Sequence, residues 1–138
     1  MRSWTSSGTT HAFLYSNGQS IEIGGLPGFE YSAAYGINDL GQIVGSSWNG
    51  AVASHERVWV YSEGVLQDLG IMGGNDARPA AINNLGQLIG TGTNITGFGG
   101  HSWVWSAGVV TVLGDPLFGD SYLVGIPEDI NDLGQIVG

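Results

Sequence analysis

The stretch GINDLGQIVG at residues 36–45 returns almost unchanged at two other places in the chain. It reads AINNLGQLIG at residues 81–90 and DINDLGQIVG at residues 129–138, where the sequence ends. A phrase that recurs at this spacing is typical of an array of similar structural units. We therefore divide a single repeat domain of residues 1–138 into three units, residues 1–45, 46–90 and 91–138.

Each copy of the phrase is expected to form a β-hairpin. Ile37 and Ile43 flank Asn-Asp-Leu-Gly, in which Gly41 can take the positive φ of a tight hairpin and Asn38 can bond the turn backbone. Because Asn, Asp and Gly are the residues that such turns require, we assign the phrase a structural role and place no ligand site in it.

The sequence predicts a second hairpin in each unit. The sequences HAFLYSNGQSIEIG, RVWVYSEGVLQDLG and HSWVWSAGVVTVLG align without a gap at residues 11–24, 57–70 and 101–114. Each contains an aromatic-rich strand, a two-residue turn that ends in Gly, and a second strand. No window keeps an apolar stripe at helical spacing. The chain is therefore predicted to be all-β with four strands per unit, which in the best-written copy are residues 33–37, 42–47, 57–61 and 65–69.

The order of these motifs resembles a known family. HAFLYSNGQ at residues 11–19, followed by SAAYGINDLGQIVG at residues 32–45, is similar to the HAF-type extracellular repeat. The first unit keeps the triplet His-Ala-Phe at residues 11–13, whereas the other units have Arg-Val-Trp and His-Ser-Trp there. The resemblance covers essentially the whole chain. It implies a repeat module of secreted or cell-surface proteins and no defined activity.

Four-stranded units of about 45 residues are typical of β-propeller blades, and propellers close with roughly four to eight of them. By this count the sequence begins near the end of one blade's second strand and finishes after the first two strands of another. Because half-blades leave open strand edges, we expect two chains with three blades each to form a six-bladed homodimer. A β-trefoil or β-prism also uses three four-stranded units and is the alternative, although the trefoil lectin signature Gln-x-Trp does not occur.

Composition limits the classes of partner. Twelve acidic and three basic residues give a formal charge of -9, which repels phosphate backbones and anionic lipid, so we expect neither nucleic acid nor a membrane. The chain has no cysteine and no apolar run that resembles a signal peptide or approaches the roughly 20 residues of a membrane span. We expect no cofactor. Loop carboxylates could hold calcium, but no recognised calcium motif supports it.

The connections between the hairpins differ most between units, and binding residues concentrate on variable loops held by a rigid frame. These connections carry aromatic rings beside amide, carboxylate and guanidinium groups. A sugar would stack on such rings and bond the polar groups. We therefore predict a carbohydrate-binding face made by Trp4, Trp48, Phe29, Tyr31, Asn75, Asp76, Arg78, Asn94, Phe98, Asp120 and Tyr122.

Three other interpretations stay open. Trp4 and Trp48, at matching positions, could simply seal the contact between neighbouring blades. The chain could also be a structural or protein-interaction module. A glycosidase-like enzyme has the least support, because no pair of acidic residues in the sequence has a spacing typical of a catalytic pair. We therefore expect a protein without catalytic activity. His11 and His101 share a position that Arg57 takes in the second unit, which argues against a repeated metal site and favours structural histidines.

Overall fold

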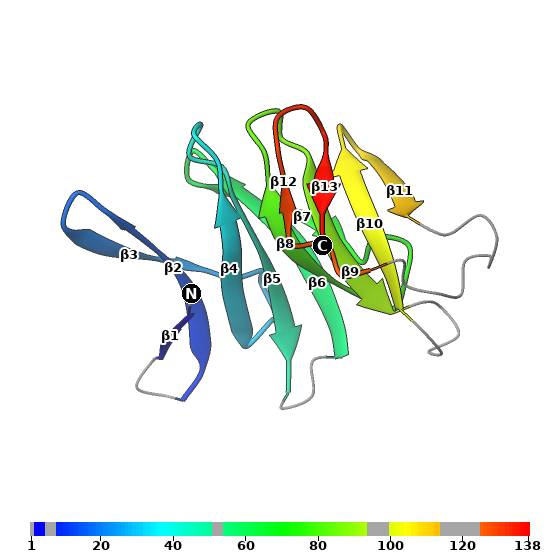
Figure 1. Ribbon diagram of the computed structural model, residues 1–138. Coiled ribbons are helices and arrows are strands. Elements are labelled where there is room, and N and C mark those ends of the chain that lie inside the picture. Colours follow the sequence, from blue (N-terminus) through cyan, green and yellow to red (C-terminus); the bar gives the residue numbers. More distant parts are fainter. Residues whose placement is uncertain (1, 5–7, 51–53, 94–99, 114–124) are drawn as a thin grey trace.

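The structure is a computed structural model that describes residues 2–4, 8–50, 54–93, 100–113 and 125–138. These residues form antiparallel β-sheets and no helix, which confirms the predicted all-β class (Figure 1). The alternation of short apolar runs with Gly, Asn and Asp turns explains this, since no segment offers a helical face.

The strands fall into four separate sheets. The first has three strands, β1 (Arg2–Trp4), β2 (Thr10–Ser16) and β3 (Gln19–Gly24). The second has four, β4 (Tyr31–Ile37), β5 (Ile43–Asn49), β6 (Ser54–Ser62) and β7 (Val65–Gly70). The third repeats that order with β8 (Asp76–Ile82), β9 (Leu88–Thr93), β10 (Gly100–Ser106) and β11 (Val109–Leu113). The fourth is the pair β12 (Asp129–Ile130) and β13 (Ile136–Val137).

Within the part of the chain that the structure describes, no sheet closes into a barrel. The four strands predicted at residues 33–37, 42–47, 57–61 and 65–69 are all present in the second sheet, and β4, β5 and β6 run two or three residues further than expected toward one end of the sheet. The extension continues the ladder at Ser47 and beyond, where Tyr31 pairs with Trp48 and Asn49 pairs with Ser54. Local pattern underestimates these strands because polar residues there still find backbone partners.

Turn chemistry sets the hairpins as predicted. Gly41 and its equivalents Gly86 and Gly134 have φ of 77°, 76° and 77°. In the other hairpins both turn residues have positive φ, as at Asn17 and Gly18 with 51° and 76°, which is the two-residue hairpin turn whose twist matches the strands.

Successive sheets pack face to face through one buried tryptophan each. Trp59 on β6 lies in an apolar cluster with Ala12 and Ile43, between the first and second sheets. Trp103 on β10 lies in the next cluster with Val58 and Leu88, between the second and third sheets. Both indoles are fully buried, so each forms the centre of an inter-sheet core.

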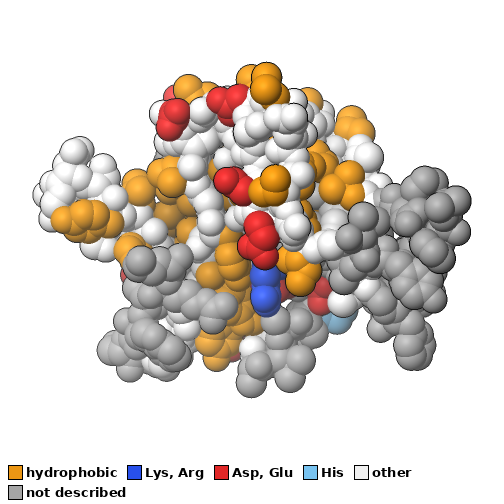
Figure 2. All heavy atoms as spheres, in the orientation of Figure 1, with side chains coloured by type: hydrophobic (Ala, Val, Ile, Leu, Met, Phe, Trp, Pro, Cys, Tyr) orange, Lys and Arg blue, Asp and Glu red, His pale blue; other side chains and the backbone are white. Residues whose placement is uncertain are grey.

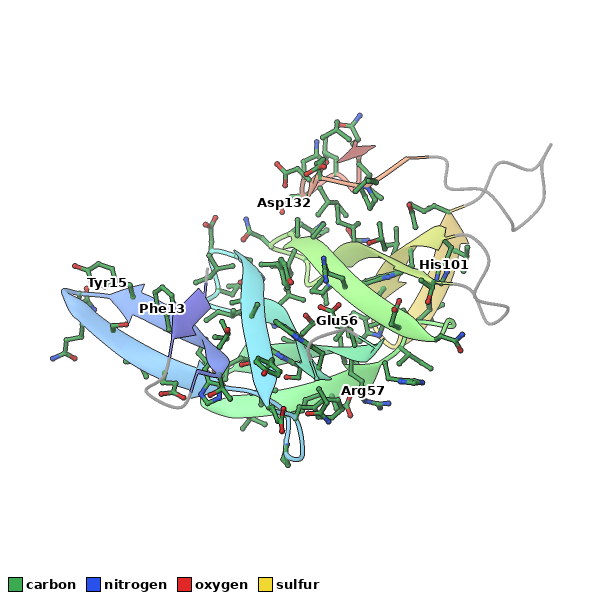
Figure 3. The ribbon with its side chains drawn as sticks, turned by 90° about the horizontal axis from the view of Figure 1, so that it is seen from below. Phe13, Tyr15, Glu56, Arg57, His101 and Asp132 are labelled. Carbon is green, nitrogen blue, oxygen red and sulfur yellow. The ribbon has the colours of Figure 1, made fainter. Side chains whose placement is uncertain are left out.

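The first strands of successive units lie next to one another. β4 contacts β8, and β8 contacts β12, while the remaining strands of each sheet extend away from this line (Figures 1 and 3). Seen from below, the first sheet lies at the left, β10 and β11 of the third sheet lie at the right, and β12 and β13 lie toward the top (Figure 3). The hairpin turns at residues 38–41, 83–86 and 131–134 lie at the same end of their sheets, at the top of Figure 1, and we call this the turn end.

The repeated turns also bond to one another. The Nδ2 of Asn38 donates to the carbonyl of Asn83 at 3.0 Å, and the Nδ2 of Asn83 donates to the carbonyl of Asn131 at 2.9 Å. The Nδ2 of Asn84 donates to both Asp39 and Asp132 at 3.0 Å. The phrase has the structural role that the sequence predicts, and it additionally links each unit to the next through a ladder of turn contacts.

Candidate functional site

The described parts of the variable connections lie opposite the turn end, where β4 and β8 begin and β5 and β9 finish (Figure 1). We call this the loop end. Five of the eleven residues predicted from the sequence for a binding face are described there with their side chains: Trp48, Tyr31, Asn75, Asp76 and Arg78. Phe29 is half-buried and packs against the cluster around Trp59, so it contributes to the core.

The remaining predicted residues cannot be placed in a site. Asn94, Phe98, Asp120 and Tyr122 lie outside the described residues. For Trp4 only the backbone is described, and it pairs with Thr10 across β1 and β2.

The aromatic pair at the loop end is formed by Tyr31 on β4 and Trp48 on β5. Their rings stack with centroids 5.8 Å apart and planes 13° apart. Trp48 is only 9% exposed, so its indole packs on the neighbouring ring and presents little surface to solvent. The stacking is a contact within the second sheet, and it leaves Trp48 little free ring surface on which a sugar could stack.

A pocket of about 310 Å³ with charged residues in its lining opens at the loop end. Glu56 on β6 and Asp76 and Arg78 on β8 line it, together with Thr91, Gly92, Thr93, Gly100 and Ile126. The pocket thus joins the second and third sheets, and two of its residues, Asp76 and Arg78, belong to the set predicted from the sequence. On the face shown in Figure 2, a basic group lies beside acidic groups with apolar side chains around them.

Glu56 is the charged centre of the pocket. Its side chain is 4% exposed, and the half-exposed Arg78 donates to its two oxygens over 3.1 to 3.3 Å. The hydroxyl of Ser46 on β5 donates to the same carboxylate. The hydrogen bonds and charge of Glu56 raise the pKa of Arg78 against the opposing effect of burial, so the guanidinium stays charged.

Asp76 is held on the opposite side of the pocket. Its Oδ1 accepts hydrogen bonds from the backbone N–H and the hydroxyl of Thr93, at 2.9 and 3.0 Å. Both carboxylates therefore have fixed orientations, and one edge of the Arg78 guanidinium faces solvent. Such an array offers directed acceptors and one charged donor to a ligand that carries several hydroxyl groups.

Sequence reasoning missed Glu56. Thr10 and Gly100 take its position in the other units, and Ala33 and Ile126 take the position of Arg78. The joint appearance of an acid and a base at positions that are otherwise small or apolar is the signal that could have revealed the pair. The pair could not be recognised from residue spacing, because the two residues lie in different sheets.

The histidines have structural surroundings. His11 pairs with Glu22 on the adjacent strand, and His101 contacts the carbonyl of Met72 at 3.3 Å. Within the described ranges no group of three or more His, Asp or Glu side chains is arranged to hold a metal ion. The same ranges contain no helix of the length and apolarity that a membrane span requires.

Comparison with known proteins gives no relative from which a function could be transferred. No protein-family description matches the chain, and no curated protein or solved structure matches it significantly. The functional argument therefore rests on the geometry of the loop end and of the open sheets.

Proposed function

We propose that the chain is a non-enzymatic binding module of β-propeller type, in which each four-stranded sheet is one blade. Support comes from the face-to-face packing of successive sheets through Trp59 and Trp103, and from the line of first strands β4, β8 and β12 along one side. In this architecture the chain contributes three blades in total, and two chains complete a ring of six.

The ligand that we propose is a carbohydrate, bound at the loop-end pocket. One observation carries the proposal: an almost fully buried carboxylate, Glu56, is fixed by Arg78 and Ser46 in a pocket that also exposes Asp76. Binding pockets for small ligands combine apolar walls with a few directed polar groups, and Ile126 supplies the apolar side here. Sugar hydroxyls can both donate to the carboxylates and accept from the guanidinium.

The same contacts favour binding over hydrolysis. Glycosidases use a pair of carboxyl groups of which one must donate a proton to the leaving group. Glu56 accepts from Arg78 and Ser46, and Asp76 accepts from Thr93, so both groups are surrounded by donors. Each carboxylate is already engaged as a hydrogen-bond acceptor, which suits a fixed binding group.

The expected partners and location follow from charge and resemblance. An acidic surface makes nucleic acid and anionic membranes unfavourable partners. The resemblance to HAF-type repeats supports a location outside the cell or on its surface, where polysaccharides are available ligands. The module needs no cofactor for this role.

The proposal is tested by retention on a panel of immobilised polysaccharides, followed by calorimetric titration with oligosaccharides of whichever polymer retains the protein. Arg78→Met should weaken binding at least tenfold. The matched control is Arg57→Met, which removes another partly exposed guanidinium; it pairs with Asp68, and neither residue lines the pocket. Circular dichroism of both variants checks that the fold is intact.

Retention of the wild-type chain on no polysaccharide would overturn the carbohydrate proposal, as would equal losses in the two variants. Release of reducing sugar during incubation would instead overturn the non-enzymatic assignment.

A further inference from the structure

Equivalent residues of the three hairpin units have very different exposures. Ile82 and Ile130 end the first strands of their sheets and are 8% and 6% exposed, because the preceding sheet covers them. Ile37 occupies the same position at the end of β4 and is 57% exposed. Among the described residues, the first sheet consists of β1, β2 and β3 and includes no strand that covers Ile37.

The opposite surface is found at β13. Val44 and Ile89 follow the repeated turn in the second and third sheets and are fully buried, whereas their equivalent Val137 is 64% exposed. Val44 belongs to the apolar cluster that contains Ile82 and Leu88 of the next sheet. The equivalents of those two neighbours are Ile37 and Ile43, and both line an open pocket of about 300 Å³ beside β2.

A second pocket, of about 480 Å³, lies under β13. Ser102, Leu113 and Ile136 line it, and they are the equivalents of Val58, Leu69 and Leu88, which surround Trp103 one unit earlier. The pocket is therefore the position at which the third strand of the fourth sheet would insert its aromatic residue. Phe13 has that position in the repeat and is only half-buried on β2.

The surroundings of the last glycine of each repeated phrase also indicate that an aromatic side chain is missing beside β13. A Cβ on Gly45 or Gly90 would meet the indole of Trp59 or Trp103 at 2.3 or 2.4 Å, as well as the backbone of the first strand. A Cβ on Gly138 would meet the first-strand backbone at Ile126 in the same way, but its nearest neighbours include no aromatic ring.

The two free strand edges are also complementary. β2 pairs with β1 only from Thr10 to Ala12, so its edge from Phe13 onward has no described partner. β13 pairs with β12, and its other edge has no partner among the described residues. In Figure 3, Phe13 and Tyr15 of β2 lie at the left, and Asp132 of the β12–β13 hairpin lies apart from them, toward the top.

We propose that the occupant of both edges is a second copy of this chain. β13 of one copy pairs with β2 of the other, Phe13 enters the pocket under β13, and Val137 enters the pocket beside Ile37. The second and third sheets define the register, because Val44 faces Val60 and Ile89 faces Val104. By the same pairing Val137 of one copy lies opposite Leu14 of the other, and Ile136 lies opposite Tyr15.

Two such contacts are formed when two copies meet, since each copy brings both edges. The inference rests on the blade architecture of the proposed function, but not on its ligand. Molar mass and cross-linking test the contact between copies, whereas retention on polysaccharides tests the carbohydrate ligand. The dimer proposal and the ligand proposal can therefore fail separately.

The first experiment is the molar mass of the 138-residue chain by light scattering coupled to size exclusion. The expected mass is about 29 kDa, twice the 14.4 kDa of one chain. A single-chain mass, or a mass of three or more chains, would overturn the proposal. Val137→Asp should shift the protein to single chains, whereas Val109→Asp, an equally exposed valine on β11, should leave the mass unchanged.

The register is tested by cross-linking, which the absence of native cysteine makes simple. Leu14→Cys combined with Val137→Cys should give a covalent dimer on a non-reducing gel, because directly opposed residues of adjacent strands are within disulfide reach. Leu14→Cys combined with Val109→Cys should remain a single chain on that gel. Equal cross-linking of both pairs, or of neither, would contradict the register.

Discussion

The side-chain amide of Asn38 donates to the backbone carbonyl of Asn83, although 45 residues separate them in the chain. Asn83 repeats the contact toward Asn131, so each copy of the turn fixes the next. Within its own turn the Oδ1 of each Asn accepts backbone N–H bonds, as Asn38 does from Leu40 and Gln42. One residue type therefore closes the hairpin with its oxygen and joins the units with its nitrogen.

The variant Asn83→Asp separates these two tasks. It keeps an oxygen for the turn but removes the Nδ2 that bonds the Asn131 carbonyl, so unfolding free energy should fall by about 1–3 kcal/mol, as for a buried group left without its partner. The comparison is Asn131→Asp, whose amide bonds Gln135 but no carbonyl of a following turn in the described chain.

Both variants should be measured by urea unfolding in a Val137→Asp background, so that no second copy can supply that carbonyl. Equal losses of stability would show that the inter-unit bond contributes nothing.

Close contact between a strand and an indole makes Gly90 hard to replace. A Cβ there would lie 2.2 Å from the carbonyl oxygen of Arg78 and 2.4 Å from the Trp103 ring, and backbone cannot yield as a flexible side chain can. Gly90→Ala should therefore destabilise the protein by about 3 kcal/mol or more. Gly125→Ala meets nothing within 4 Å and should change the melting temperature little. Similar thermal unfolding of both variants would disprove this packing argument.

Features set by local chemistry could be predicted from the sequence. Gly41 adopts positive φ because the turn demands it, and the Asn-Gly turn at residues 17–18 specifies its hairpin without help from the rest of the chain. These turn residues predict the strands of the second sheet to within a few residues. They carry no information about where polar residues such as Ser47 continue to pair.

Features that depend on the contact between two sheets could not be predicted from the sequence. Glu56 and Arg78 form a pair only because β6 packs against β8, and neither residue is unusual within its own strand. Trp48 and Phe29 look like available aromatic surfaces in the sequence, yet one stacks on Tyr31 and the other packs against a core cluster. Side-chain burial is a property of the assembled sheets, and the repeat pattern alone does not report it.

Removal of one member of the Glu56 pair should cost more than removal of both. Arg78→Ala leaves a buried carboxylate with only Ser46 as a described side-chain partner, and we expect a loss of about 2 kcal/mol, below the value for fully buried pairs because Arg78 is half exposed. The double variant Glu56→Thr with Arg78→Ala recreates the residues Thr10 and Ala33 of the preceding contact. It should regain at least half of the lost stability in denaturant unfolding. Strict additivity of the single changes would refute this coupling.

The ladder of turn contacts at the turn end predicts an unfavourable pair of carboxylates in the proposed dimer. Within one chain Asn84 lies between Asp39 and Asp132 and donates to both carboxylates. Continued into a second copy, the same spacing brings Asp132 beside Asp39 of that copy, and no amide separates the two negative charges. Asp132→Asn should therefore tighten the dimer severalfold, because its amide can donate across the contact as Asn84 does. Dilution series analysed by sedimentation equilibrium would measure the change.

The control is Glu63→Gln, which removes the same charge from an exposed turn away from the contact and should leave the dissociation constant nearly unaltered. An equal effect of the two changes would assign the gain to net charge and remove Asp132 from the interface.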